Sequence, residues 1–132
     1  MTDLGPLPSL PVRVPLRWSP ETNDLVKSGA VEFRGLLRVA GDALVLELRP
    51  HGPLGDGELS EHAIALADLS AVSFSTRWWR TRLTLRPRRL AAFADIPGLV
   101  QGDLRLTVAR GDRPLGSRWA TALSLALLDR EG

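Results

Sequence analysis

The residues with the clearest chemical potential lie between positions 75 and 82, where two adjacent tryptophans stand among arginines. The residues that we expect to contact a ligand or partner are Arg77, Trp78, Arg80 and Arg82. An indole ring can stack on a flat surface, and a guanidinium group can bind a carboxylate or phosphate through two parallel hydrogen bonds. No acidic residue occurs between Asp68 and Asp95. The segment is therefore typical of a surface that binds an anionic or aromatic partner.

The tryptophan pair also has a purely structural interpretation. Neighbouring side chains of a strand point to opposite faces, so Trp78 and Trp79 cannot both enter a core. The outward indole, from either residue, would contact a partner or cover a sheet edge beneath arginine side chains. Because Trp and Arg are enriched among the residues that dominate binding energies, a protein–protein or homodimer contact is the favoured functional interpretation.

The composition limits the classes of protein to consider. The chain has 132 residues, of which 44% are hydrophobic and 24% charged, as expected for one globular domain. It has no cysteine, and its two histidines, His51 and His62, lack a metal-ligand spacing, so we expect neither metal nor cofactor. No apolar run is long enough for a transmembrane segment, and the start, with Asp3, does not resemble a signal peptide. The expected location is the cytoplasm.

The basic residues are nearly all arginine. Of 17 basic residues only Lys27 is lysine, and the net charge is +2. This bias is typical of a GC-rich genome, and it also suits anion recognition by the guanidinium fork. A net charge so close to zero argues against nucleic-acid binding, which usually needs a broad basic surface.

The pattern of apolar residues predicts a mainly β domain. Residues 1–11 contain three prolines and are expected to form a flexible lead-in, followed by one domain over 12–132. Apolar residues alternate from Val12 to Trp18, and Pro15 suggests that this strand lies at a sheet edge. The further predicted strands span 31–39, 44–49, 63–66, 69–74, 79–85 and 104–108.

The end of the chain changes to helical spacing. Asp112 is a suitable N-cap and Pro114 suits a first turn, so a helix is predicted over about 113–130. Its apolar face includes Leu115, Trp119, Ala122, Leu123, Ala126 and Leu127. We expect this face to pack on the sheet, with Trp18 and Trp119 in the core.

The order of elements resembles the pleckstrin-homology-like (PH-like) barrel of bacterial proteins. The segment over 33–47 is similar to the opening hairpin of that family, and 64–72 is similar to its junction of a hydrophobic residue, Asp, Leu, a small residue and Val. The resemblance implies an antiparallel barrel of six to seven strands with one C-terminal α-helix. It also implies a non-enzymatic module that binds lipid headgroups, peptides or another protein.

A second resemblance leads to an alternative ligand. Arg13 and Arg17 have the spacing of the arginine motif of PilZ domains, which bind cyclic di-GMP, and the segment from Asp68 to Ser73 is similar to their second motif, with serine in place of the final glycine. Two arginines at that spacing can bind guanine edges and phosphates. The alternative nucleotide-binding residues are therefore Arg13, Arg17 and Asp68.

Catalytic patterns are weak. Glu58, Glu61 and His62 lie close in sequence beside a glycine-rich loop, but the run Ser60-Glu61-His62 does not have the spacing of a catalytic triad. The sequence therefore predicts a non-enzymatic interaction module that associates with itself or another protein through Arg and Trp, with an anionic lipid headgroup or cyclic dinucleotide as alternative ligand.

Overall fold

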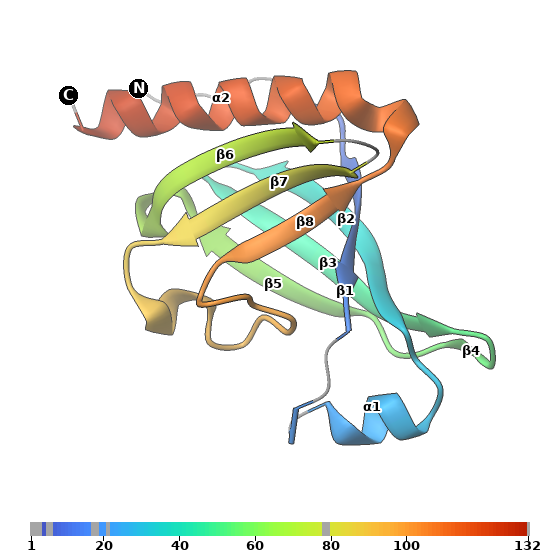
Figure 1. Cartoon of the computed structure of the whole chain (residues 1–132). Helices are drawn as coiled ribbons and strands as arrows, with labels where there is room; N and C mark the ends of the chain where they lie inside the picture. The colour runs from blue at the N-terminus through green and yellow to red at the C-terminus, as the bar shows by residue number, and fades with distance from the viewer. Residues whose placement is uncertain (1–3, 5–6, 17–18, 21, 78–79, 132) are drawn as a thin grey trace.

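A computed structural model describes residues 4, 7–16, 19–20, 22–77 and 80–131, the side chains of 130 and 131 excepted. The chain is mainly β, with an eight-stranded antiparallel sheet and a long C-terminal helix (Figure 1). The strands are β1 (Leu10–Pro15), β2 (Glu32–Ala40), β3 (Ala43–Gly52), β4 (Gly55–Asp56), β5 (Ser60–Ala65), β6 (Leu69–Arg77), β7 (Arg80–Pro87) and β8 (Leu104–Val108). The helical elements are α1 (Asn23–Lys27), α2 (Arg113–Glu131) and the 3₁₀ turns η1 (Leu66–Asp68), η2 (Leu90–Phe93) and η3 (Arg110–Asp112).

The sheet consists of two meanders joined through one pair of strands. The first meander is β1-β2-β3-β5 and the second is β6-β7-β8, and β8 pairs with β1 between them. Helix α2 packs mainly on β6, whereas α1 lies at the opposite end of the molecule (Figure 1). The predicted fold class and C-terminal helix are thus confirmed. The additional strand is the two-residue β4, which forms within the glycine-rich loop.

The prediction that the first strand is an edge strand is wrong. Strand β1 lies between β2 and β8, and it begins at Leu10, inside the predicted flexible lead-in. It pairs with β2 along its whole length but with β8 only where Arg13 faces Thr107. In a strand, the backbone N–H groups of alternate residues point to the same neighbouring strand, and proline has no N–H group. Pro11 and Pro15 therefore fit a central strand that meets its second neighbour only at Arg13.

The core lies between the inner face of the sheet and α2. The side chains of β1 alternate between buried and exposed, and Leu10, Val12 and Val14 are the buried ones. Trp119 of α2 is fully buried, and its indole Nε1 donates a hydrogen bond to the carbonyl oxygen of Pro8 at 2.9 Å. The helix thereby holds the segment that precedes β1. Trp18, the other predicted core tryptophan, lies outside the described residues.

Strands β2 and β3 approach each other closely at Gly35. A Cβ atom at this position would overlap the carbonyl oxygen of Glu47. The backbone of Gly35 and the backbone of Glu47 are both fixed in the β2–β3 ladder, so any larger residue at position 35 would push the strands apart. Glycine is therefore required at position 35 of β2.

The helices α1 and α2 differ greatly in length, with 5 and 19 residues. Within the described part of the chain, no helix combines the length and the apolarity needed to cross a lipid bilayer.

Trp119→Ala should lower the free energy of unfolding by about 3–5 kcal/mol, because it leaves a large cavity and an unpaired carbonyl at Pro8. Chemical denaturation measures this loss. Leu125→Ala on the same helix is the control, since Leu125 is 58% exposed and its replacement should change the midpoint little. An unchanged midpoint for Trp119→Ala would contradict the packing of α2 on the sheet.

Candidate functional site

Five residues of five neighbouring strands form a transverse row on the outer face of the sheet. They are consecutive cross-strand partners, from β7 to β3: Arg82, Thr107, Arg13, Arg34 and Arg49. We call this set the arginine row. At 4.7–4.9 Å between neighbouring strands, it extends for about 19 Å along the sheet. Four guanidinium groups are thus presented side by side by residues that are far apart in the sequence.

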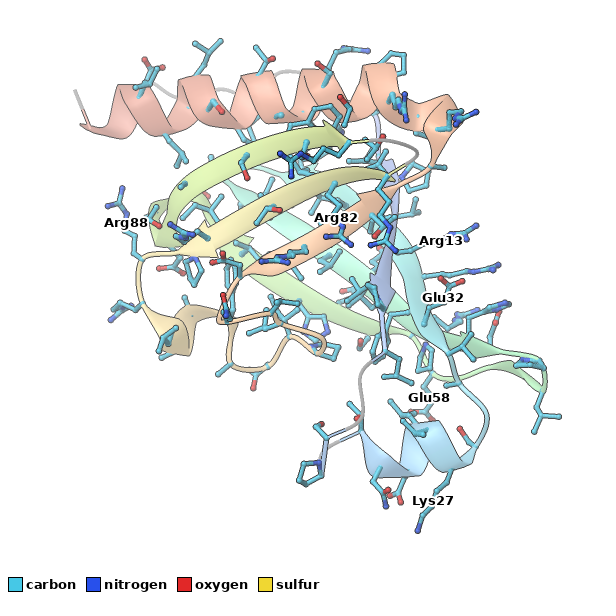
Figure 2. All side chains as sticks on the ribbon, in the orientation of Figure 1. Arg13, Lys27, Glu32, Glu58, Arg82 and Arg88 are labelled. Atoms are coloured by element: carbon cyan, nitrogen blue, oxygen red, sulfur yellow. The ribbon has the colours of Figure 1, made fainter. Side chains whose placement is uncertain are left out.

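The alternation of each strand directs these side chains outward. Leu83 and Leu106, the sequence neighbours of Arg82 and Thr107, are fully buried. Val12, which precedes Arg13, is only 3% exposed. Directly paired residues of an antiparallel ladder share a face, so the members of the row must all lie on the outer face. Figure 2 shows the labelled Arg82 and Arg13 on this face of β7 and β1.

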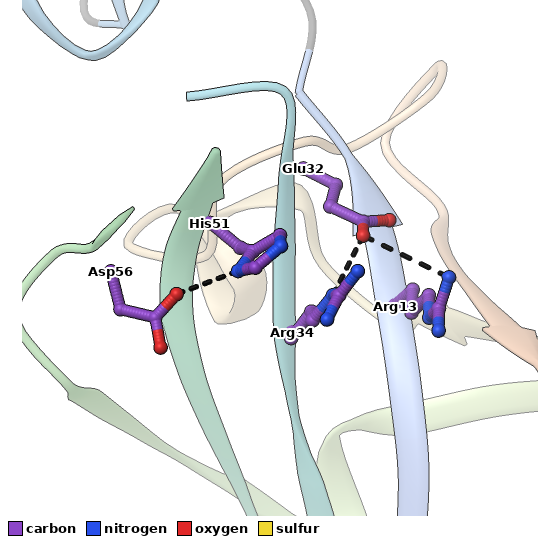
Figure 3. Close-up of polar contacts among 5 residues, drawn as sticks. All are labelled: Arg13, Glu32, Arg34, His51 and Asp56. Atoms are coloured by element: carbon purple, nitrogen blue, oxygen red, sulfur yellow. Dashed lines mark hydrogen bonds and ion pairs between the residues drawn. The ribbon is translucent and has the colours of Figure 1, made fainter. Parts of the chain in front are cut away.

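The electrostatics of the arginine row are unfavourable in the free protein. Like charges placed directly opposite on neighbouring strands repel, and Arg13 opposes Arg34, which in turn opposes Arg49. Glu32 offsets part of this repulsion, since its Oε1 lies 2.7 Å from Arg34 Nε and 3.8 Å from Arg13 Nη1 (Figure 3). Arg49 and Arg82 have no carboxylate partner among the described residues.

Two other arginines of the sheet, Arg38 and Arg86, pair with neighbouring carboxylates. Arg38 Nε lies 3.0 Å from Glu47, and its guanidinium also reaches Glu61 at 3.8 Å. Arg86 binds Asp103 through two nitrogens, and this hydrogen-bonded pairing raises the pKa of Arg86. The row is therefore distinguished from these arginines by its shortage of carboxylate partners.

A hollow of about 270 Å³ lies beside the centre of the row. Its walls include Arg13, Arg34 and Thr107 together with Ala109 and Asp112, which follow β8. Two guanidinium groups and a hydroxyl group supply donors that suit a carboxylate or phosphate oxygen. The hollow thus offers donors for a single anionic group, and Asp112 adds one carboxylate to the same wall.

The structure brings together residues that the sequence had assigned to two separate sites. Arg77 and Arg80 pair at the end of the β6–β7 hairpin, and Arg82 follows in the row. Arg13, from the alternative nucleotide site, belongs to the same row. Trp78 and Arg17, the remaining arginine of that alternative site, lie outside the described residues.

Asp68 is not part of this assembly. It lies in η1, and the next residue, Leu69, pairs with Pro87 at the far end of β7. Pro87 is five residues beyond Arg82, or about 16 Å along the strand. Arg13 and Asp68 therefore do not form a common site in this structure.

Three arginines near the site were missed by the sequence analysis. Arg34 and Arg49 belong to the row, and Arg105 lies on β8 two residues before Thr107, with an outward position of the same kind. Their outward positions follow from alternation within each strand. Their place beside Arg13 depends on the pairing of strands that are distant in sequence, which no local pattern specifies.

A second hollow, of about 750 Å³, lies at the end of the sheet remote from α2. It is formed by α1, the ends of β2 and β3, the start of β5 and the loop over 94–98. Ser60 Oγ lies 3.0 Å from His62 Nε2 on its β5 side. Burial lowers the pKa of His62, and the nearby charge of Asp95 partly offsets this effect. The lowered pKa favours the neutral form of the imidazole.

Comparisons of the chain with models of protein families, with curated proteins and with solved structures gave no match. Within the described residues, no group of three histidine, aspartate or glutamate side chains is arranged to hold a metal ion.

His62 should make the stability of the protein sensitive to mild acid. Because its folded pKa is lowered, the unfolded chain binds the proton first as the pH falls through about 6.5. The free energy of unfolding should therefore decrease below this pH, and less so in His62→Asn. Urea denaturation of both proteins at neutral and mildly acidic pH measures the difference, with the carboxylates and His51 common to both. The same pH dependence in both would contradict the burial of a neutral imidazole.

Proposed function

We propose that this protein is a non-enzymatic interaction module that binds an acidic surface of a partner protein through the arginine row. The observation that carries the proposal is the cross-strand register that lines up Arg82, Thr107, Arg13, Arg34 and Arg49. Guanidinium groups bind carboxylates in a bidentate geometry, and arginine is enriched at protein interfaces. A row of them along a sheet suits a surface that presents several carboxylates.

The energetics of the free protein support this choice of partner. Glu32 is the only carboxylate that pairs with the row among the described residues, so repulsion between its arginines is only partly compensated. An acidic partner supplies the missing counter-charges and relieves that repulsion on binding. Complementary charge of this kind mainly increases the association rate and the specificity.

A homodimer built on this face is disfavoured by symmetry. A two-fold interface brings the same patch of both subunits together, so arginine would face arginine. Self-association through the row would therefore increase the repulsion rather than relieve it. For this reason a different, acidic protein is the partner that we propose.

The resemblance to PH-like domains, which implies a non-enzymatic binding module, supports the same class of function. Anionic lipid headgroups and cyclic dinucleotides also bind guanidinium groups, and they remain the alternatives. The separation of Asp68 from Arg13 weighs against a PilZ-like nucleotide site. The experiment below distinguishes the three ligands.

The arginine row should bind a fluorescein-labelled acidic peptide of alternating glutamate and serine, measured by fluorescence anisotropy. Binding should weaken as NaCl rises from about 0.05 M to about 0.3 M, because salt screens exposed charges. Arg13→Gln combined with Arg82→Gln should weaken binding about tenfold, equivalent to roughly 1.4 kcal/mol. Parallel titrations use vesicles that contain phosphatidylserine, and cyclic di-GMP.

The matched control is Arg89→Gln combined with Arg118→Gln, which removes the same charge from exposed positions on η2's N-terminal side and on α2. This variant should bind the peptide within about twofold of the wild type if the site is local. Equal losses in the two variants would show a general charge effect and contradict the proposed site. Binding of vesicles or cyclic di-GMP without binding of the peptide would contradict the proposed partner.

A further inference from the structure

The hollow at the α1 end of the sheet has the size of a small-molecule site. Its volume of about 750 Å³ lies within the range of about 300–1,000 Å³ that is typical of ligand pockets. Side chains from distant parts of the chain supply an apolar lining, among them Leu25, Phe33, Leu59 and Ile96. Phe33 and Ile96 are themselves buried, whereas Leu59 is half exposed at the rim. The pocket can therefore surround the apolar body of a ligand.

Hydrogen bonds between Ser19 and Thr22 stabilise one wall of the pocket. The backbone amide of Ser19 donates to Thr22 Oγ1 at 2.9 Å, and the amide of Thr22 donates to Ser19 Oγ at 3.2 Å. This reciprocal pairing fixes the chain directly before α1. Thr22 is buried, which is consistent with a well-packed wall rather than a loosely covered gap.

The charge of the pocket is opposite to that of the arginine row. Its ionisable lining residues, among those described, are Glu58, Asp95 and His62, and the described lining contains neither lysine nor arginine. Burial lowers the pKa of His62 and so favours its neutral form. Among the described lining residues, two carboxylates thus line an apolar hollow and no lysine or arginine accompanies them. These two carboxylates repel an anionic ligand and attract a cationic one.

A polar anchor lies beside the two carboxylates. Ser60 and His62 are two residues apart on β5 and therefore share a face of the strand. Their side chains are 3.0 Å apart, and Ser60 Oγ also contacts the carbonyl oxygen of Leu48 at 3.3 Å. The β3–β5 ladder thus holds the pair in place. The pair can accept a hydrogen bond from a bound polar group or donate one to it.

We propose that this pocket binds a small organic cation, an ammonium group carried on an apolar body. Asp95 and Glu58 bind the ammonium group, Phe33, Leu59 and Ile96 surround the apolar body, and the Ser60–His62 pair orients it. This site is separate from the arginine row in both position and sign of charge. Loss of either function therefore leaves the other intact.

The test is a titration of the isotopically labelled chain with 2-phenylethylammonium, followed by heteronuclear NMR. Saturable shifts are expected at the amides of Leu59, Ser60 and His62 and in the loop over 94–98. Two isosteric probes, the neutral 2-phenylethanol and the anionic phenylacetate, should bind at least about fivefold more weakly because they cannot pair with the carboxylates. Equal affinity for all three probes, or no saturable shift in the pocket at millimolar ammonium, would overturn the proposal.

A pair of variants separates local pairing from general charge. Asp95→Asn should weaken binding of 2-phenylethylammonium about fivefold and leave that of 2-phenylethanol unchanged, since only the charged partner is removed. Asp129→Asn, at an exposed position of α2, removes the same charge far from the pocket and should have no effect. Equal losses in the two variants would show that the ammonium group is attracted only by the net charge of the protein. Shifts at the arginine row instead of the pocket would also contradict the proposal.

Discussion

The structure depends on one contact, the pairing of β1 with β8 where Arg13 faces Thr107. This pair joins the two meanders and brings their buried leucines and valines into one core beneath α2. Pro11 and Pro15 restrict the ladder to this point because neither has an amide to donate. The same contact sets the outer face, since it aligns the arginine of β7 with those of β1, β2 and β3. Fold and candidate site thus share one constraint.

Because of this register, like charges lie side by side on the outer face of the sheet. The packing of the core must outweigh the repulsion between them. Glu32 lies between Arg13 and Arg34 and relieves part of it (Figure 3). Arg38 and Arg86, outside the row, have carboxylate partners of their own. The pocket at the α1 end carries charge of the opposite sign, because Glu58 and Asp95 lie beside an apolar hollow. A net charge of +2 therefore conceals two surfaces of opposite character. Local charge distribution, rather than net charge, determines which ligands such a protein attracts.

The sequence predicts elements that have a regular pattern. Alternation identified the long strands, and helical spacing identified α2 to within one residue at its end. Periodic patterns missed α1 and β4, which are too short to carry a period. Alternation identified β1 as a strand, but its expected place at a sheet edge, inferred from Pro15, was wrong. Arg82 and Arg13 were both identified, but as members of different sites. Only the register between strands distant in sequence unites them and adds Arg34 and Arg49, and a register is a property of the assembled sheet.

The most direct test of this account is the measurement of cross-strand nuclear Overhauser effects in the labelled protein. The account predicts contacts between the backbone protons of Arg13 and Thr107, and between those of Arg82 and Thr107, because these residues are direct partners. A register shifted by one residue would turn Arg13 toward the core and Val12 outward, and the arginine row would not exist. Contacts between Thr107 and Val12 or Val14 in place of Arg13 would therefore contradict both the sheet topology and the proposed binding surface.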